Sequence, residues 1–196
     1  MGFTLGSHFI NPTQGGPRAR LIVIGGLPGT GKTTLSKAIV RELSAVYLRV
    51  DVVETPLIRA GVEVGPLGYE VVRELEASNL ELGGKVVVGL VNPLHVTRAM
   101  WRELAAALDV PLVVFECVLP DRAEHRRRVE GRVPDLKGQV TPTWAEVLDR
   151  EYEPWDDSID GPRVRIDMTD AASATEAAIR ALAEVPSGQQ VAPDSA

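Results

Sequence analysis

The stretch Gly26-Leu27-Pro28-Gly29-Thr30-Gly31-Lys32-Thr33 follows directly on the apolar run Arg20–Gly25, which reads Arg-Leu-Ile-Val-Ile-Gly. A short, continuous apolar run is typical of a strand buried on both faces of a parallel sheet. Behind the glycines, a helical pattern continues to about Ser44 with its apolar residues on one face. The order of strand, glycine-rich turn and helix predicts a loop that binds a phosphate group at the end of the first strand.

The same stretch has the spacing of the P-loop pattern, which is Gly, four residues, Gly-Lys and then Ser or Thr. Glycines let successive backbone N–H groups point at a phosphate, and the following helix directs its positive end at the same anion. Lys32 would add a charge for the β- and γ-phosphates, and the Thr33 hydroxyl is placed to bind Mg²⁺. A tight glycine turn without a ligand is the alternative, but it gives no reason for the lysine and threonines. The predicted nucleotide contacts are Gly26, Gly29, Thr30, Gly31, Lys32, Thr33 and Thr34.

Strand-like and helical segments alternate along the rest of the chain. Further strands are expected at residues 45–50, 85–91, 111–119 and 163–167, and further helices near 67–82, 92–108, 121–132 and 173–185. Five such alternations predict a three-layer α/β domain whose parallel sheet has right-handed crossovers. Ligands of such sheets bind at the carboxyl ends of the strands, so the residues that follow each strand are the candidates for function.

Two of the helices have recognisable start signals. Asn92 and Pro93 suit an N-cap and a first-turn proline, and the apolar stripe behind them begins at Val96. Ser173 and Glu176 have the spacing of a capping box. We therefore expect helices that begin at these residues, with Val96 turned toward the core.

Composition narrows the class of protein. The 196 residues are 44% hydrophobic and 24% charged, as in ordinary globular proteins. The formal net charge of −6 argues against a non-specific nucleic-acid binder, because such proteins need a basic face. Cys117 is the only cysteine, which excludes an intrachain disulfide and a four-thiolate zinc site, and we expect it to be buried.

The ends of the chain and its hydropathy predict where the protein acts. Residues 1–17 and 186–196 lack periodicity, so we expect a flexible leader and a flexible tail around one domain at 18–185. No stretch has the apolar length of a membrane span, and no basic-then-apolar leader opens the chain. We expect a cytoplasmic protein with neither a membrane nor a nucleic acid as its partner.

Asp51 falls at the end of the second predicted strand and should overlook the phosphate site. A carboxylate at this place can accept a proton from a substrate hydroxyl, or bind that hydroxyl and the water shell of the metal. The alternative is a helix cap or a solvated acid at a strand end. We favour catalysis, with water-mediated contact to Mg²⁺ as a further role, because sites of α/β sheets form at this edge.

The predicted helix at 121–132 is rich in arginine. Arg128 and Arg132 lie four residues apart and share a face, from which they can close over a nucleotide and neutralise charge on the transferred group. We take these two as catalytic candidates and Arg126 as a further nucleotide contact. The alternative is a solvated helix on which Glu124 and Arg128 form a surface pair.

An excursion beyond this helix, at residues 131–155, contains Pro134, Gly138, Pro142 and Pro154. Together with the arginine helix it makes a candidate lid at 121–155 that folds over substrate and excludes water. An ordinary structured insertion, anchored by buried tryptophans, is the alternative. The three histidines are far apart in the sequence, so a histidine metal site is not expected.

With these elements assembled, the chain resembles the small ATP-binding kinases of the P-loop superfamily. It is most similar to their zeta-toxin-like and chloramphenicol-phosphotransferase-like group, and it also resembles gluconate and adenylylsulfate kinases. The resemblance covers roughly residues 21–167. It rests on Gly-Leu-Pro-Gly-Thr-Gly-Lys-Thr-Thr at 26–34, Arg-Val-Asp at 49–51, Val-Asn-Pro at 91–93, Glu-His-Arg-Arg-Arg-Val-Glu-Gly-Arg at 124–132 and Tyr-Glu-Pro-Trp at 152–155.

The resemblance implies a nucleoside-monophosphate-kinase-like fold with a five-stranded parallel sheet of order 2-3-1-4-5, and ATP and Mg²⁺ as cosubstrates. It places phosphate binding on Gly29, Gly31, Lys32 and Thr33, substrate contact or base function on Asp51, and lid contacts on Arg128 and Arg132. Many relatives carry an aspartate in the third strand where this chain has Gly89. Asp51 is then the only obvious carboxylate near the metal.

Three functions are compatible with these features. The leading one is an ATP- and Mg²⁺-dependent kinase that phosphorylates a hydroxyl of a small molecule, such as an antibiotic, a sugar or a nucleoside-like acceptor. The second is a nucleotide-binding switch or partner-binding protein with weakened catalysis, which the glycine at position 89 favours. The third is a toxin that phosphorylates a cell-wall nucleotide sugar.

Overall fold

The computed structural model describes residues 19–185, so the predicted leader and tail lie outside the described part of the chain. Five strands form one all-parallel sheet in the order β2-β3-β1-β4-β5, which confirms the predicted fold class and strand order. The strands are β1 (Arg20–Gly25), β2 (Val46–Arg49), β3 (Lys85–Gly89), β4 (Leu112–Val118) and β5 (Val164–Asp167).

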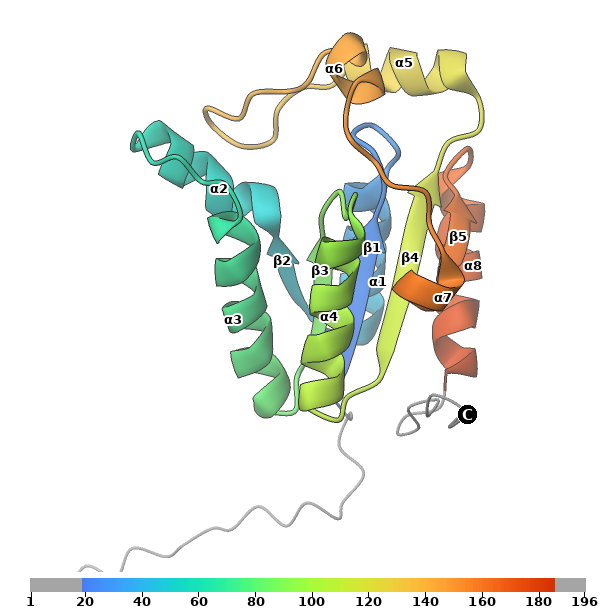
Figure 1. Cartoon of the computed structure of the whole chain (residues 1–196). Helices are drawn as coiled ribbons and strands as arrows, with labels where there is room; N and C mark the ends of the chain where they lie inside the picture. The colour runs from blue at the N-terminus through green and yellow to red at the C-terminus, as the bar shows by residue number, and fades with distance from the viewer. Residues whose placement is uncertain (1–18, 186–196) are drawn as a thin grey trace, which may run out of the picture.

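Helices cover both faces of this sheet (Figure 1). One face is covered by α1 (Lys32–Leu43) and α8 (Ala171–Glu184), and the other by α3 (Leu67–Glu81) and α4 (His95–Ala107), with α7 (Asp157–Asp160) beside α4. Because side chains alternate along a strand, β1 serves two cores. Leu21 and Val23 belong to the core under α3 and α4, whereas Ile22 and Ile24 belong to the core under α1 and α8. The strand that leads into the glycine loop is therefore fully buried.

Three further helices lie at the carboxyl edge of the sheet. α2 (Val50–Arg59) begins directly after β2, and α5 (Arg122–Glu130) and α6 (Trp144–Leu148) lie above the strand ends (Figure 1). The sequence did not predict α2, α6 or α7, because α2 follows its strand without a turn signal and the other two are very short. Residues 131–143 extend from α5 across this edge toward α2 (Figure 1).

The fourth helix begins later than its Asn-Pro signal indicated. α4 starts at His95, and Asn92 adopts a left-handed conformation with φ 57° instead of capping the helix. On α4, Val96 is 69% exposed while Arg98 and Trp101 are buried. The prediction of an inward Val96 was wrong, because a polar arginine takes the core-facing position.

Two other expectations have clear outcomes. Asp170 caps α8 by accepting a hydrogen bond from the Ser173 N–H at 2.8 Å, so the helix begins before the predicted capping box. Cys117 is buried, as predicted. Within residues 19–185, no helix is both long enough and apolar enough to cross a bilayer.

One acid lies in the core without a signal in the sequence. The side chain of Glu76, on the inward face of α3, is fully buried, and its carboxyl oxygens find no hydrogen-bond partner within residues 19–185. Burial raises the pKa of Glu76 to about 9, because a carboxylate is poorly stabilised away from water. The group is therefore a neutral acid at pH 7.

Candidate active site

The glycine loop between β1 and α1 needs glycine for two separate reasons. Gly26, Gly29 and Gly31 have φ values of 136°, 83° and 96°, which side chains strongly disfavour. Space is also lacking, because a Cβ on Gly26 would lie 2.5 Å from the Cys117 carbonyl oxygen and one on Gly29 would lie 2.6 Å from Val129 Cγ2. The loop can therefore curl only with glycines at these positions.

The loop leaves the start of α1 available to a ligand. Gly31 occupies the N-cap and provides no side-chain hydrogen bond to the first turn, so the first N–H groups of α1 lack a side-chain cap. The Thr30 hydroxyl donates to the Leu27 carbonyl oxygen at 2.8 Å and stabilises the turn from inside. Uncapped N–H groups at a positive helix end can bind an anion, and this geometry is compatible with the predicted phosphate site, which stays a prediction.

Lys32, the first residue of α1, forms no ion pair within residues 19–185. Its Nζ donates to the Leu27 carbonyl oxygen at 2.7 Å, so the side chain folds back on the loop. Burial lowers the pKa of Lys32 to about 8, and the nearby charges of Arg132 and Arg150 act in the same direction. An anionic ligand would restore the full charge of this ammonium group.

Helix α5 forms a roof over the glycine loop. His125 Nε2 lies 2.7 Å from the Pro28 carbonyl oxygen, and Val129 packs on Gly29. The Trp144 ring of α6 meets the His125 ring edge to face, with ring centres 5.1 Å apart. Sequence reasoning considered His125 only as a metal ligand, although its spacing of four residues from Val129 indicates a shared helix face. The histidine instead holds the arginine helix on the loop.

A pocket of about 550 Å³ lies at the carboxyl edge of the sheet, between the glycine loop, α2 and residues 131–142. It brings together seven of the predicted site residues, which are Gly29, Gly31, Lys32, Thr33, Asp51, Arg128 and Arg132. The predicted residues Gly26, Thr30, Thr34 and Arg126 do not line it. Further polar side chains, which the sequence did not single out one by one, also line the pocket: Tyr47, Arg49, Glu54, Thr55, Tyr69, Asp135, Gln139 and Arg150.

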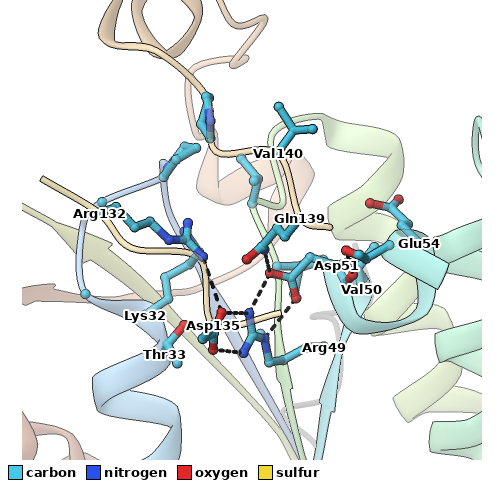
Figure 2. Close-up of a pocket in the computed structure, with 18 of the residues that line it drawn as sticks. Lys32, Thr33, Arg49, Val50, Asp51, Glu54, Arg132, Asp135, Gln139 and Val140 are labelled. Carbon is cyan, nitrogen blue, oxygen red and sulfur yellow. Dashed lines mark hydrogen bonds and ion pairs between the residues drawn. The ribbon is translucent and has the colours of Figure 1, made fainter. Parts of the chain in front are cut away.

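The strongest polar contacts of the pocket centre on Arg49, the last residue of β2 (Figure 2). Its Nε and Nη2 donate to the two carboxylate oxygens of Asp51 at 2.8 and 2.6 Å, and its Nη1 and Nη2 donate to Asp135 at 2.5 and 3.2 Å. Burial opposes the charged guanidinium, but the two carboxylates outweigh burial and raise the pKa of Arg49. One guanidinium therefore connects β2, α2 and the excursion.

Asp51 lies at the second position of α2 instead of the predicted strand end. Both of its carboxylate oxygens accept from Arg49, and one of them also accepts from Gln139 Nε2 at 2.8 Å. A carboxylate held in this way is well oriented. It can accept a substrate proton only after it exchanges one of these donors for the substrate hydroxyl.

The three arginines predicted as ligand contacts differ in placement. Arg126 pairs with Glu130 on the exposed side of α5, away from the pocket. Arg128 lines the pocket but donates to Glu124 at 2.6 Å and to the Met168 and Thr169 carbonyl oxygens at 2.9 and 3.2 Å. Only Arg132 points into the pocket with a loose contact, 3.9 Å from Asp135 (Figure 2). The predicted roles remain predictions, and the geometry supports Arg132 best.

At the end of β3, a tyrosine occupies the space beside the glycine that replaces the expected aspartate. A Cβ on Gly89 would lie 3.2 Å from the Tyr47 hydroxyl and 3.5 Å from Ser36 Oγ. Burial raises the pKa of Tyr47, and the nearby hydroxyls of Ser36 and Thr33 oppose that rise. The tyrosine hydroxyl thus lies close to the Thr33 hydroxyl.

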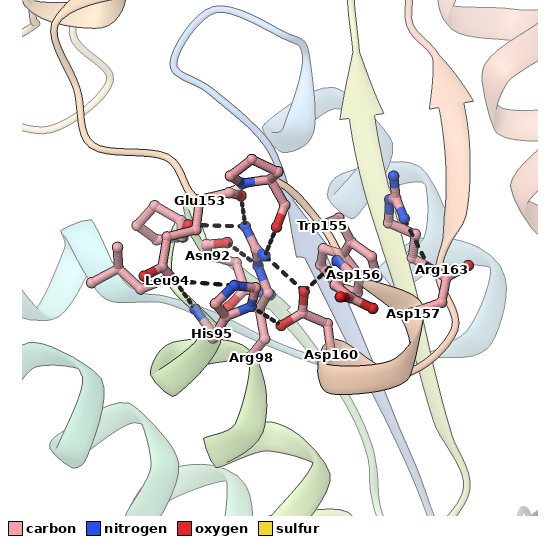
Figure 3. A network of polar contacts seen from close by, with 12 residues as sticks. Asn92, Leu94, His95, Arg98, Glu153, Trp155, Asp156, Asp157, Asp160 and Arg163 are labelled. Atoms are coloured by element: carbon pink, nitrogen blue, oxygen red, sulfur yellow. Dashed lines mark hydrogen bonds and ion pairs between the residues drawn. The ribbon is translucent and has the colours of Figure 1, made fainter.

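A second arginine fixes the far end of the excursion (Figure 3). Arg98 is 2% exposed, and its N–H groups donate to the Asp160 carboxylate at 2.9 Å and to backbone carbonyl oxygens at 2.6–3.3 Å. Those carbonyls belong to Asn92, Pro93, Glu153 and Pro154. His95 Nδ1 lies 2.7 Å from the same Asp160 carboxylate, and the Trp155 ring covers the guanidinium at 4.7 Å. Residues 153–160 are therefore attached to the start of α4.

Residues 21–151 match the family model of an AAA domain. The chain belongs to this AAA-domain family. The match spans the glycine loop, Asp51, the arginine helix and most of the excursion. The matched residues therefore include the residues that line the pocket. No curated protein matches the sequence of the chain.

Solved structures similar to this AAA-domain protein include three kinases. A sugar kinase from Janibacter sp. HTCC2649 has a TM-score of 0.63 at 16% identity, over 86% of this chain and 96% of its own. A gluconokinase from Sinorhizobium meliloti 1021 has a TM-score of 0.60 at 19% identity, over 85% and 92%. The APS kinase of Mycobacterium tuberculosis, in complex with AMPPNP and APS, has a TM-score of 0.57 at 19% identity, over 86% and 100%. At these identities the likeness shows the fold alone, which is that of P-loop kinases.

Proposed function

We propose that the protein is a kinase that transfers the γ-phosphoryl group of ATP to a hydroxyl group of a small molecule. The observation that carries the proposal is the meeting of two features in one pocket. An uncapped helix start with a partly buried lysine, suited to a polyphosphate, opens into the same space as an oriented carboxylate, Asp51. Phosphoryl transfer needs little more than such positioning and charge stabilisation.

In this proposal the N–H groups at the start of α1 and the ammonium group of Lys32 bind the β- and γ-phosphates. Arg132, at the rim of the loop, neutralises charge on the transferred group. Asp51 exchanges a contact with Arg49 or Gln139 for the acceptor hydroxyl and orients it or takes its proton. Arg128 stabilises the roof through its contacts with the loop after β5.

Magnesium fits these residues as a partner of the nucleotide. Within residues 19–185, no cluster of three or more His, Cys, Asp or Glu side chains could hold a metal by itself. The Thr33 hydroxyl lies in the pocket lining at the start of α1 and would bind Mg²⁺ together with phosphate oxygens, and Asp51 would reach it through water. When bound, the ion neutralises charge on the phosphates.

The acceptor is a hydroxylated small molecule, and the segment from α2 to Tyr69 and the excursion line its side of the pocket. The sugar kinase and the gluconokinase among the structural neighbours support a polyhydroxylated acceptor. Within the AAA-domain family we place the chain near the zeta-toxin-like and chloramphenicol-phosphotransferase-like group. That placement rests on the motifs around Asp51 and the arginine helix.

The direct test is incubation with ATP, Mg²⁺ and a panel of sugars, sugar acids, nucleosides and hydroxylated antibiotics. We expect phosphate transfer to one class of acceptor, and we expect Lys32→Ala to abolish it. Tight ATP binding without transfer to any acceptor would contradict the proposal. That result would favour a nucleotide-binding switch or partner-binding protein, the alternative for which Gly89 is the specific observation.

A further inference from the structure

The Asp135 carboxylate of the excursion lies between two arginine side chains of the pocket (Figure 2). Its oxygens accept from Arg49 at 2.5 and 3.2 Å, and its Oδ1 lies 3.9 Å from Arg132 Nη2. Hydrogen bonding with Arg49 lowers the pKa of Asp135, so the group is ionised at neutral pH. A carboxylate of the protein therefore occupies the place where two cationic side chains face the pocket.

Arg49 does not need this second acid to be neutralised. Asp51 already pairs with it through two hydrogen bonds, and the Arg49 side chain is only 8% exposed. Asp135, whose side chain is 38% exposed, adds a second negative charge to a guanidinium that already has one. The two acids are about equally exposed, at 37% and 38%, but Asp51 follows Arg49 by two residues at the start of α2, whereas Asp135 comes from the excursion. Only the pairing with Asp135 therefore depends on the position of the excursion.

Polar contacts attach the segment that carries Asp135 to the pocket. Val133 and Val140 on either side of Asp135 are 83% and 87% exposed. The other contacts are a bond from Gln139 to Asp51 and a 3.4 Å bond from Arg59 to the Lys137 carbonyl oxygen. Contacts of this kind are weak individually and exchange readily with solvent or ligand.

We propose that Asp135 occupies a subsite for an oxyanion of the ligand, which displaces it when the ligand binds. The planar forks of Arg49 and Arg132 suit a carboxylate or a phosphoryl group equally well. The inference rests on the proposed function, because it assigns that subsite either to the γ-phosphate of the nucleotide or to an acidic group of the acceptor. Asp135 then keeps the two arginines apart and oriented until the ligand arrives.

The competing explanation is that Asp135 holds the excursion closed over bound ligand. The two explanations predict opposite signs for Asp135→Asn. If Asp135 occupies the ligand's place, the variant removes a competitor and tightens binding of the oxyanion, by about five- to tenfold. If Asp135 only closes the excursion, the variant weakens binding.

The nucleotide arm of the test uses calorimetry of ADP and AMPPNP with Mg²⁺. Tighter AMPPNP binding by Asp135→Asn, with ADP binding unchanged, would assign the subsite to the γ-phosphate. Comparing the two nucleotides isolates the contribution of the γ-phosphate, and a control variant that also deletes one acid accounts for the general effect of the lost charge. Asp149→Asn is the matched control, because Asp149 is an exposed acid of the same excursion outside the pocket lining.

The acceptor arm uses matched pairs that differ in one acidic group, such as gluconate with glucitol and glucose 6-phosphate with glucose. A lower KM for the acidic member alone in Asp135→Asn would assign the subsite to the acceptor. Arg49→Lys keeps the charge and loses the fork, so it should weaken whichever anion the subsite binds. A thermal melt of each variant checks that the fold is intact.

Unchanged or weaker binding of every anion by Asp135→Asn, relative to Asp149→Asn, would overturn the inference. The calorimetric comparison of ADP and AMPPNP tests the inference without depending on catalysis. If no acceptor is phosphorylated, the kinase proposal fails, and the AMPPNP comparison still shows whether Asp135 occupies an oxyanion subsite. If neutral acceptors are phosphorylated and Asp135→Asn has no effect on any anion, the kinase stands and the inference fails.

Discussion

Two buried arginines hold the two ends of the excursion, and they do so with different chemistry. Arg98 meets one buried carboxylate, Asp160, and four backbone carbonyl oxygens, and its side chain is 1% exposed. Arg49 meets two carboxylates, Asp51 and Asp135, whose side chains are 37% and 38% exposed. The first arginine is enclosed by the protein, and the second lies at the wall of an open pocket.

The difference between the acceptors of Arg98 and Arg49 indicates which of these contacts a ligand can replace. Backbone carbonyls cannot leave their places without unfolding the segment, and a buried guanidinium that loses them is left without acceptors. A half-exposed carboxylate can turn to water, and a ligand oxyanion can replace it at little cost. We therefore expect the excursion to be permanently attached at residues 153–160 and releasable at Asp135.

The largest effect on stability should come from removing Arg98, which holds residues 153–160. Arg98→Met leaves Asp160 charged and buried without its arginine partner, so we expect the free energy of unfolding to fall by about 3–5 kcal/mol. Arg49→Met should cost about 1 kcal/mol or less, because its partners are half exposed. Denaturant melts of both variants measure the difference. Equal losses would mean that the two ends are equally fixed.

Lys32 is a third cation, partly buried, and it lies in the pocket without an ion-pair partner among the described residues. Lys32→Ala should reduce kcat/KM by about 100-fold or more, roughly 3 kcal/mol of transition-state stabilisation. The fold should be as stable as the wild type, since the substitution removes an ammonium group whose charged form the protein already disfavours, as its lowered pKa shows. Steady-state kinetics and a melt separate the two quantities. An unchanged rate would remove Lys32 from the mechanism.

A smaller effect is expected at the strand end that lacks the usual acid. Gly89→Asp places a Cβ 3.2 Å from the Tyr47 hydroxyl, so the variant should lose about 1–3 kcal/mol of stability and gain no activity. Adding Tyr47→Phe removes the hydroxyl and should recover most of the loss. ATPase turnover and melts of the single and double variants test this. A large gain in turnover by Gly89→Asp alone would support a site damaged by the glycine.

The smallest effect is a pH dependence that distinguishes Lys32 from the paired arginines. With a pKa of about 8 in the free protein, Lys32 loses its charge as the pH rises through 8. ATP affinity should therefore fall by about tenfold between pH 7 and pH 9, and binding at pH 8.5 should take up protons. Lys32→Arg, which stays charged, should show a flat profile. Calorimetry in buffers of different ionisation enthalpy measures both, and a flat wild-type profile would contradict the lowered pKa.

Much of the candidate site could be predicted because the residues that form its glycine loop are neighbours in the sequence. The glycine loop needs only the spacing of Gly26, Gly29, Gly31 and Lys32 and an apolar strand before it, and those features are contiguous in the sequence. The strand-helix alternation similarly determined the sheet, since parallel strands joined by helices have few possible arrangements. Resemblance to known kinases supplied the strand order, which the structure bears out.

The partners of the arginines could not be predicted, because they come from distant parts of the chain. Asp135 is 86 positions from Arg49, and Asp160 is 62 positions from Arg98. The predicted helix at residues 121–132 is conspicuous for its five arginines. In the structure, however, Arg126 faces away from the pocket and Arg128 is bound to a distant loop. The two arginines that organise the excursion lie instead at the end of a strand and inside a helix, where nothing in the local pattern sets them apart.

The sequence by itself determined the phosphate-binding loop and the sheet that presents it, because backbone conformation and apolar periodicity act over a few residues. Only the tertiary structure decided which charges meet in the pocket, that Tyr47 takes the space beside Gly89, and that Glu76 is a neutral acid in the core. Burial and pairing arise from segments that meet only when the chain folds, so charge state and ligand specificity are properties of the folded molecule.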